Sequence, residues 1–137
     1  MELTLELARQ VLAAQPFSVL VGARVVAFGG GGATLEIDTR DELKQQNGFL
    51  HGGVLAYAAD NAITFAAGTV LGPSVLTGGF AIDYLRPGVG RTLVARAAVV
   101  QSTRRRAVAR CDLSVVDEEG AETAVAFAQG TVVVTGG

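Results

Sequence analysis

The sequence is poor in the residues that build disulfides, metal sites and nucleic-acid interfaces. It holds one cysteine and one histidine, which rules out an intrachain disulfide and a metal site built on a histidine pair. Eleven Lys and Arg against thirteen Asp and Glu leave a net charge of −2, which gives no basic field for nucleic acid. We therefore expect no disulfide, no metal, no cofactor and no nucleic-acid partner.

The N-terminal residues also lack the basic stretch followed by an apolar stretch that marks a secretion signal. The lone cysteine, Cys111, is most simply a core residue, and such cysteine usage fits the reducing cytosol, so we expect a cytoplasmic protein. Apolar residues make up 50% of 137 positions and aromatics only 6%. This composition predicts one domain over residues 1–137, with a core of Val, Leu and Ala.

One long apolar stretch, residues 53–71, is the central feature of the chain. Its small apolar side chains occur on all sides of a helical projection, which predicts a buried helix. The stretch is long enough to span a bilayer, but Asp60 and Asn61 lie at its centre, where a charge is costly. We therefore expect a core helix and no membrane partner. Asp60 has no Lys or Arg three or four positions away, which is unusual because buried Asp is almost always paired.

The rest of the chain reads as one further helix and six strands. Apolar residues on one face predict a helix over residues 2–14, with Glu2 and Glu6 near its start and Pro16 after its end. The polar, glycine-containing sequence of residues 39–50 predicts a loop with at most a short helical turn. The β-type segments are residues 17–28, 33–38, 74–85, 91–101, 106–116 and 123–135.

Short connections between these segments predict antiparallel hairpins. The four glycines at 29–32 join the first pair, and turns at 87–88, 102–105 and 117–120 join the last four segments. In residues 106–116 apolar and polar side chains alternate, so one face of that strand is expected to be buried. One long helix with about six strands predicts an α+β fold whose sheet curls around the helix.

Three segments carry a resemblance to a known family. Residues 45–53 (QQNGFLHGG), Asp60 nine positions after His51, and residues 80–88 (FAIDYLRPG) resemble the hotdog-fold acyl-CoA thioesterases of the PaaI-like, phenylacetate-pathway branch. The closing Gln129-Gly130-Thr131 adds to the resemblance. It implies the hotdog fold, a long helix wrapped by a curved antiparallel sheet, in agreement with the pattern above. It also implies homodimers, often paired into homotetramers.

The resemblance implies that Asp60 is the general base or the nucleophile, and the sequence leaves open which of the two it is. The alternative is a buried Asp capped by neighbouring hydroxyls, with Thr64 in reach one turn later. Backbone N–H groups of Gly52 and Gly53 at the helix start are expected to polarise the thioester carbonyl. The same two glycines would also serve a tight turn into the helix.

Four more residues are candidates for the site. Gln45 lies where relatives often have Asn and would orient water or hold the thioester oxygen, with Asn47 as a nearby alternative and a local turn bond as the plainer explanation. His51 either hydrogen-bonds the carbonyl region or fixes the loop. Thr77 aligns with a Ser or Thr that positions water in some relatives, although threonine is common in strands for packing reasons.

Helix geometry adds an inference that does not depend on the family. Nine helical residues advance about 13 Å and turn about 180°. His51 and Asp60 of one chain therefore cannot touch the same reacting atom. If both serve one site, Asp60 must come from a second subunit, which predicts a homodimer with two shared active sites.

Binding of the coenzyme and the acyl group involves further candidates. Four arginines are suited to binding CoA phosphates, because a guanidinium group can donate two parallel hydrogen bonds to one phosphate: Arg86 and the run Arg104, Arg105 and Arg106. The alternative for the run is a solvated hairpin tip. Tyr57 and Phe80, with Ile63 and Phe65, are expected near the pocket at the dimer interface. The sequence does not show which of them point inward.

The function expected from these residues is acyl-CoA thioesterase, a thioester hydrolase acting on aryl or medium-sized acyl groups. A hydratase of the same fold would pair a catalytic His with a carboxylate in another local arrangement. The remaining alternative is a non-catalytic hotdog module that binds acyl-CoA as a sensor. Such a module would keep the coenzyme groove but would need no carboxylate, so the presence of Asp60 favours the hydrolase.

Overall fold

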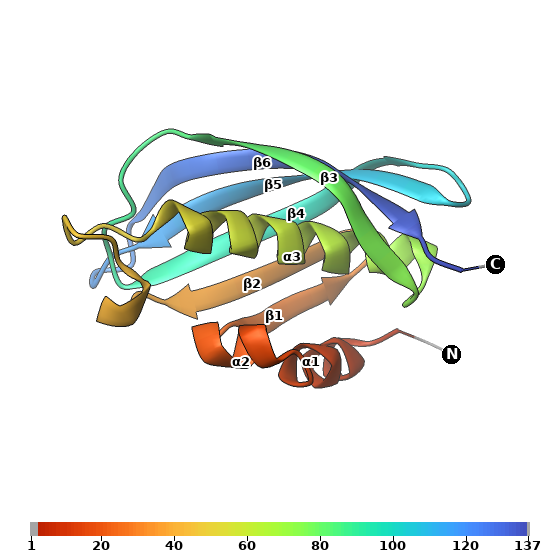
Figure 1. Ribbon diagram of the computed structural model, residues 1–137, viewed down its shortest axis with the longest axis horizontal. Helices are drawn as coiled ribbons and strands as arrows, with labels where there is room; N and C mark the ends of the chain where they lie inside the picture. Colours follow the sequence, from red (N-terminus) through yellow and green to blue (C-terminus); the bar gives the residue numbers. More distant parts are fainter. Residues whose placement is uncertain (1–2, 137) are drawn as a thin grey trace.

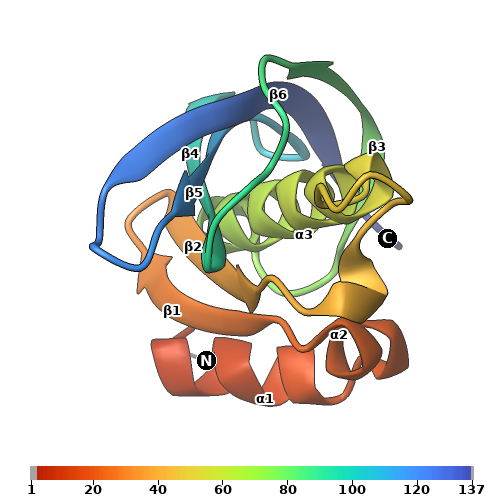
Figure 2. The same ribbon diagram turned by 90° about the vertical axis from the view of Figure 1, so that its left-hand side faces the viewer.

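A curved antiparallel sheet wraps one long helix in the computed structural model, which describes residues 3–136 (Figure 1). The helix is α3 (Gly52–Leu71), and Figure 2 shows it lying along the concave face of the sheet. Two short helices, α1 (Leu5–Ala13) and α2 (Pro16–Val21), lie on the other side of α3 next to the β1 edge. The α+β hotdog architecture predicted from the sequence is confirmed.

The sheet has six strands within the described residues, and all neighbouring strands are antiparallel. Its order is β1-β2-β4-β5-β6-β3. The strands are β1 (Arg24–Gly29), β2 (Gly32–Asp38), β3 (Val75–Tyr84), β4 (Thr92–Ser102), β5 (Arg106–Val116) and β6 (Glu122–Val134).

The glycine hairpin and the strand alternation are both as predicted. Gly30 and Gly31 take φ values of 60° and 86°, the left-handed conformation that a tight turn between β1 and β2 requires. In β5 the alternate side chains face the core, and the buried ones are Ala107, Ala109, Cys111, Leu113 and Val115.

The prediction that β3 and β4 form a hairpin at residues 87–88 is wrong. β3 pairs with β6 at one edge of the sheet, whereas β4 lies between β2 and β5. The connecting residues 85–91 form a crossover and not a turn. The N–H groups of Leu85 and Arg86 bond to the carbonyl of Val125, and the carbonyl of Gly88 accepts from Leu50, so the crossover is fixed along the end of the sheet.

The N-terminal prediction is half right. The helix predicted over residues 2–14 is α1, capped by Thr4, whose hydroxyl accepts from the N–H of Leu7; Glu2 lies outside the described residues. The strand predicted over residues 17–28 is wrong in its first half, which forms α2. Pro16 occupies the first turn of α2, where its missing N–H costs nothing, and Gly22 ends the helix in the left-handed conformation. The strand itself begins only at Arg24.

The core lies between α3 and the concave face of the sheet. Ala59, Ala62, Ile63, Ala66 and Ala67 of α3 are fully buried there. Among the described helices, α3 alone has the length and hydropathy of a membrane span. Because it packs inside the curl of the sheet, it serves as the core helix of the fold, as the sequence predicts.

Candidate active site

The loop before α3 is held by its own hydrogen bonds. Lys44 and Leu50 form an isolated β-bridge, and a short 3₁₀ turn, η1 (Asp41–Leu43), precedes it. The Gln45 Oε1 atom accepts from the N–H of Asn47 at 2.5 Å and of Phe49 at 3.3 Å. Gln45 therefore makes the local turn bond, and Asn47 lies exposed at the loop tip.

His51 caps the N-terminus of α3. Its Nδ1 atom accepts from the N–H of Gly53 at 2.8 Å, so a neutral imidazole carries its proton on Nε2. A Cβ atom on residue 53 would lie 2.9 Å from that Nδ1, which explains the second glycine. The N–H of Gly52 has no acceptor among the described residues. Of the two predicted amide donors, Gly52 is thus the one open to a ligand.

Asp60 lies two turns further along α3, half-buried, with no ion-pair partner among the described residues. Thr77 of β3 donates to its Oδ1 atom at 2.5 Å. The Thr64 hydroxyl bonds the backbone carbonyl of residue 60 at 2.9 Å and the Thr77 hydroxyl at 2.8 Å. Thr77, and not Thr64, therefore holds the carboxylate, while Oδ2 has no partner within residues 3–136.

Comparison with known proteins decides the family, because the thioesterase superfamily model matches residues 47–124, which contain all of these groups except Gln45. The chain belongs to the thioesterase superfamily. It is a thioester hydrolase of the PaaI-like hotdog type, as the resemblance implied. No curated protein sequence matches the chain at a significant level.

Solved structures share the fold over most of the chain. A thioesterase family protein from Silicibacter pomeroyi is 31% identical, with a TM-score of 0.88 over 94% of this chain and 96% of its own. A mutant of the phenylacetic acid degradation protein PaaI from Thermus thermophilus is 34% identical, with a TM-score of 0.76 over 88% and 100%. PaaI from E. coli shares the fold at 23% identity, with a TM-score of 0.83 over 95% and 91%.

In one chain of this thioesterase, the two halves of the predicted site stay apart. His51 is the N-cap residue of α3 and Asp60 lies nine residues along the same helix, about 13 Å away at 1.5 Å per residue. The structure brings Asp60 and Thr77 together, and separately groups Gln45, Asn47, His51 and the two glycines around the start of α3.

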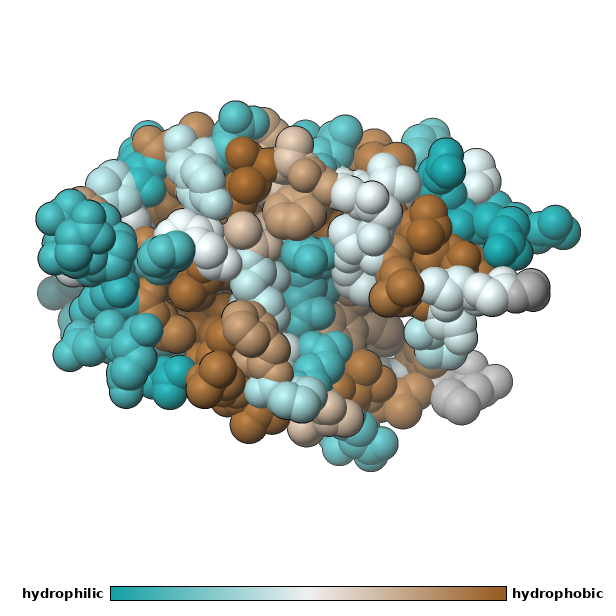
Figure 3. All heavy atoms as spheres, viewed as in Figure 1, coloured by the Kyte–Doolittle hydropathy of each residue, from teal (hydrophilic) through white to brown (hydrophobic). Residues whose placement is uncertain are grey.

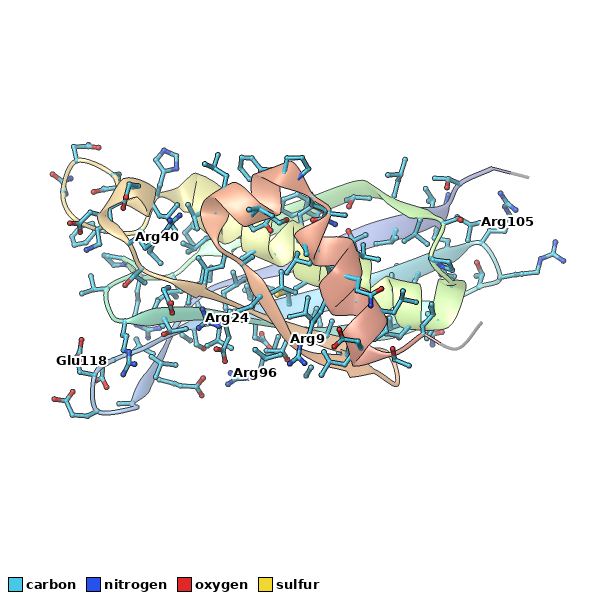
Figure 4. All side chains as sticks on the ribbon, turned by 90° about the horizontal axis from the view of Figure 1, so that it is seen from below. Arg9, Arg24, Arg40, Arg96, Arg105 and Glu118 are labelled. Carbon is cyan, nitrogen blue, oxygen red and sulfur yellow. The ribbon has the colours of Figure 1, made fainter. Side chains whose placement is uncertain are left out.

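The arginines predicted to bind coenzyme lie in different places. Arg86 donates to the carbonyl of Ala124 at 2.7 Å and is exposed. Arg104 and Arg105 are exposed at the β4–β5 turn, and Arg106 begins β5. Figure 4 shows Arg105 at the opposite end of the molecule from Arg40, and Figure 1 shows that α3 begins at the Arg40 end. Within one chain the run is a solvated hairpin tip remote from Gly52.

A polar pocket at the Gly52 end of the thioesterase was not predicted. Its volume is about 480 Å³, and its wall includes Arg40, Lys44 and Arg91 with the carboxylates of Asp38 and Glu118. These five residues come from three separate segments, residues 38–44, 90–91 and 118, so no single sequence motif marks them. Only the fold brings the three cations to one place.

The aromatic candidates have separate roles. The Tyr57 hydroxyl lies 2.5 Å from that of Ser18 and accepts from Asn61 Nδ2 at 3.0 Å, and its ring meets Phe17 edge-on at 5.3 Å. Tyr57 thus contacts α2. Phe80 is exposed on β3, whereas Ile63 and Phe65 lie in the core. Of the four, Phe80 alone lies on an open edge of the sheet.

Proposed function

We propose that the protein is an acyl-CoA thioesterase acting on aryl or medium-sized acyl groups, with Asp60 as general base or nucleophile. The observation that carries the proposal is the unpaired carboxylate of Asp60 in the middle of an apolar helix. One of its oxygens is held by Thr77 and the other has no partner among the described residues. A carboxylate kept in such surroundings is suited to accepting a proton or attacking a carbonyl carbon.

The chemistry needs a polarised carbonyl beside that carboxylate. The N–H of Gly52 supports this role, because it lies at the N-terminus of α3 and no described residue occupies it. As a general base, Asp60 would take a proton from water while the water oxygen attacks the thioester carbon. The carbonyl oxygen then carries negative charge toward Gly52. When the C–S bond breaks, the coenzyme leaves as a thiolate that takes up the proton.

If Asp60 is instead the nucleophile, its oxygen bonds to the acyl carbon, the C–S bond breaks, and water then hydrolyses the mixed anhydride. Thr77 serves either route by fixing the carboxylate. Gln45 would orient water through its amide nitrogen, which bonds to none of the described residues, since only its oxygen is used in the loop. His51 is an exposed residue, and its Nε2 atom would be a further donor near the carbonyl.

A homodimer with shared sites follows from the separation of Gly52 and Asp60 along α3. β3 supports it, since it is an edge strand of the sheet with exposed side chains at Leu76, Phe80 and Tyr84. Pairing at such an edge would place Asp60 of one subunit opposite Gly52 of its partner. The pairing of dimers into tetramers, the coenzyme role of the arginines and the cytoplasmic location stay predictions.

The test is thiol release from a panel of aryl and straight-chain acyl-CoAs. We expect Asp60→Asn to lose at least about a hundredfold in kcat, the range of general-base catalysis, while CoA ester binding is retained. Asp112→Asn, an exposed carboxylate on β5, is the matched control and should keep full turnover. Equal turnover by Asp60→Asn would remove Asp60 from the mechanism. Binding without turnover by the wild-type protein would favour the acyl-CoA-binding module instead.

A further inference from the structure

A cavity of about 160 Å³ lies between α1, the second half of α3 and the start of β3. Leu7 and Val11 of α1 form its outer wall, and Phe28, Phe65 and Val75 line its inner side. In Figure 3 it opens as a recess at the lower right, among brown, hydrophobic atoms between α1 and β3. Its wall is largely apolar, so it favours an uncharged, apolar occupant.

The cavity begins where the candidate active site ends. Thr64 lies on its wall, and the Thr64 hydroxyl touches the Thr77 hydroxyl that holds the Asp60 carboxylate. Asn61, the residue after Asp60, lines it as well. Two hydrogen bonds thus separate the cavity wall from the carboxylate of the same subunit. A group attached to a carbon beside Asp60 is therefore within reach of this space.

Gly68 keeps part of this space open. It is a buried glycine inside α3, where alanine is the more stable choice. A Cβ atom at position 68 would meet no atom within 4 Å, so packing does not require glycine there. Gly68 lines the cavity, and an added side chain would project into it.

A polar cluster fixes the outer wall onto α3. Asn61 Nδ2 donates to Gln15 Oε1 at 3.2 Å, to Ser18 Oγ at 3.3 Å and to Tyr57 Oη at 3.0 Å. The Ser18 hydroxyl also donates to Gln15 Oε1 at 2.6 Å. Gln15 and Ser18 belong to the α1–α2 segment, whereas Tyr57 and Asn61 belong to α3. The cluster fixes the start of α2 onto α3 beside the cavity, whose wall includes Gln15 and Asn61.

We propose that this cavity receives the acyl group of the thioester bound at Asp60 of the same subunit, and that α1 and Gly68 set the largest acyl group accepted. The inference rests on the proposed function and deepens it. An apolar cavity of about 150 Å³ holds one benzene-sized molecule. The occupant is therefore an acyl group of about one ring or a short chain, and a long straight chain would extend beyond the cavity into solvent.

The test compares acetyl-, hexanoyl-, phenylacetyl- and decanoyl-CoA across variants at position 68. In Gly68→Leu, kcat/KM for phenylacetyl-CoA relative to acetyl-CoA should fall at least tenfold, and in Gly68→Ala by less. Gly68→Ala should also raise the melting temperature, because alanine is the better helix former. Ala98→Leu, an enlargement on the exposed face of β4, is the control and should leave the ratio unchanged.

An unchanged ratio in Gly68→Leu would overturn the proposal, as would decanoyl-CoA being the best wild-type substrate. If Gly68→Leu does not fold, the graded loss in Gly68→Ala decides in its place. If wild-type protein turns over no ester, the proposed function fails, and binding of uncharged phenylacetamide by calorimetry tests the cavity alone. Tenfold weaker binding by Gly68→Leu than by wild type would support the cavity as the binding site, and equal binding would overturn it.

Discussion

Thr77 donates a 2.5 Å hydrogen bond to the carboxylate of Asp60, across the gap between β3 and α3. The single proton of Thr77 is used in this bond, and the Thr64 hydroxyl, 2.8 Å from that of Thr77, donates to the backbone carbonyl of residue 60 at 2.9 Å. The carboxylate therefore has one oxygen fixed in direction and one without a partner among residues 3–136. In the proposed mechanism Thr77 positions Asp60, and this hydrogen bond is a physical reason for a side chain that the sequence marks only through resemblance.

Replacement of Thr77 by Val should lower kcat for thioester hydrolysis by about tenfold, because the carboxylate loses a hydrogen bond but keeps its charge. KM should change little. Thr77→Ser retains the hydroxyl and should restore most of the rate. Steady-state kinetics on the preferred acyl-CoA make the comparison, and equal rates for the Val and Ser variants would show that packing by Thr77 matters and its hydroxyl does not.

His51→Ala should lower the free energy of unfolding by about 1 kcal/mol, the usual loss for an N-cap, since the N–H of Gly53 loses its acceptor. Asn is a strong N-cap residue, so His51→Asn should restore the stability. Chemical denaturation measures both variants. We expect turnover to follow stability; a His51→Asn protein that is as stable as wild type yet inactive would show that the imidazole takes part in catalysis.

Ser18→Ala should destabilise the protein by about 1–2 kcal/mol, because the buried hydroxyl joins Gln15, Tyr57 and Asn61 and its removal leaves their polar groups short of partners. Ser74→Ala, at an exposed position, is the control and should have almost no effect. Thermal and urea unfolding provide the measurement. Equal stability of the two variants would mean that the cluster does not fix α2 onto α3.

Cys111 provides a dependence of stability on alkaline pH. Its thiol is fully buried, and this burial raises its pKa to about 12. Since the folded protein then binds the thiol proton more tightly than the unfolded chain, whose thiol pKa is about 8.5, this contribution is complete below about pH 8 and declines as pH rises toward 12.

Between pH 7 and pH 10 the free energy of unfolding of wild type should therefore fall by about 2 kcal/mol relative to that of Cys111→Ala, because unfolding releases the thiol proton at the higher pH. Urea denaturation of both proteins at the two pH values gives this difference. In native protein the thiol should react with a thiol reagent only as fast as the chain opens. A difference that does not change with pH would contradict the burial argument.

Much of the fold was predictable because it depends on local patterns. The all-apolar stretch of α3, the four glycines of the β1–β2 turn and the alternation in β5 each specify an element without knowledge of its neighbours. The partner of β3 was not predictable, since Pro87-Gly88 has the composition of a turn and its crossover path depends on hydrogen bonds from Leu85, Arg86 and Leu50 to distant segments. α2 was misjudged because Phe17–Val21 has strand-type residues, and the tertiary contacts of Ser18 and Val21 override that propensity.

In the candidate site, too, local sequence motifs were predictable and contacts between distant residues were not. Asp60 and the His51-Gly52-Gly53 turn lie within a short sequence motif, so the sequence alone was enough to predict them as site residues. The contact between Thr64 and Thr77, the cluster around Ser18 and the empty space at Gly68 join residues that are up to dozens of positions apart. A glycine inside an apolar helix is only a weak indication of a cavity, since such glycines also occur where there is no cavity.

The residues that match the superfamily begin at position 47, whereas α1 and α2 end at Val21. The outer wall of the cavity is therefore contributed by a stretch of chain that precedes the shared catalytic core. Substitutions in α1 alter the shape of the cavity and leave Asp60, Thr77 and Gly52 in place. If the cavity receives the acyl group as proposed, an exchange of this N-terminal segment between relatives would give one hydrolytic core a different range of substrates without any change in its chemistry.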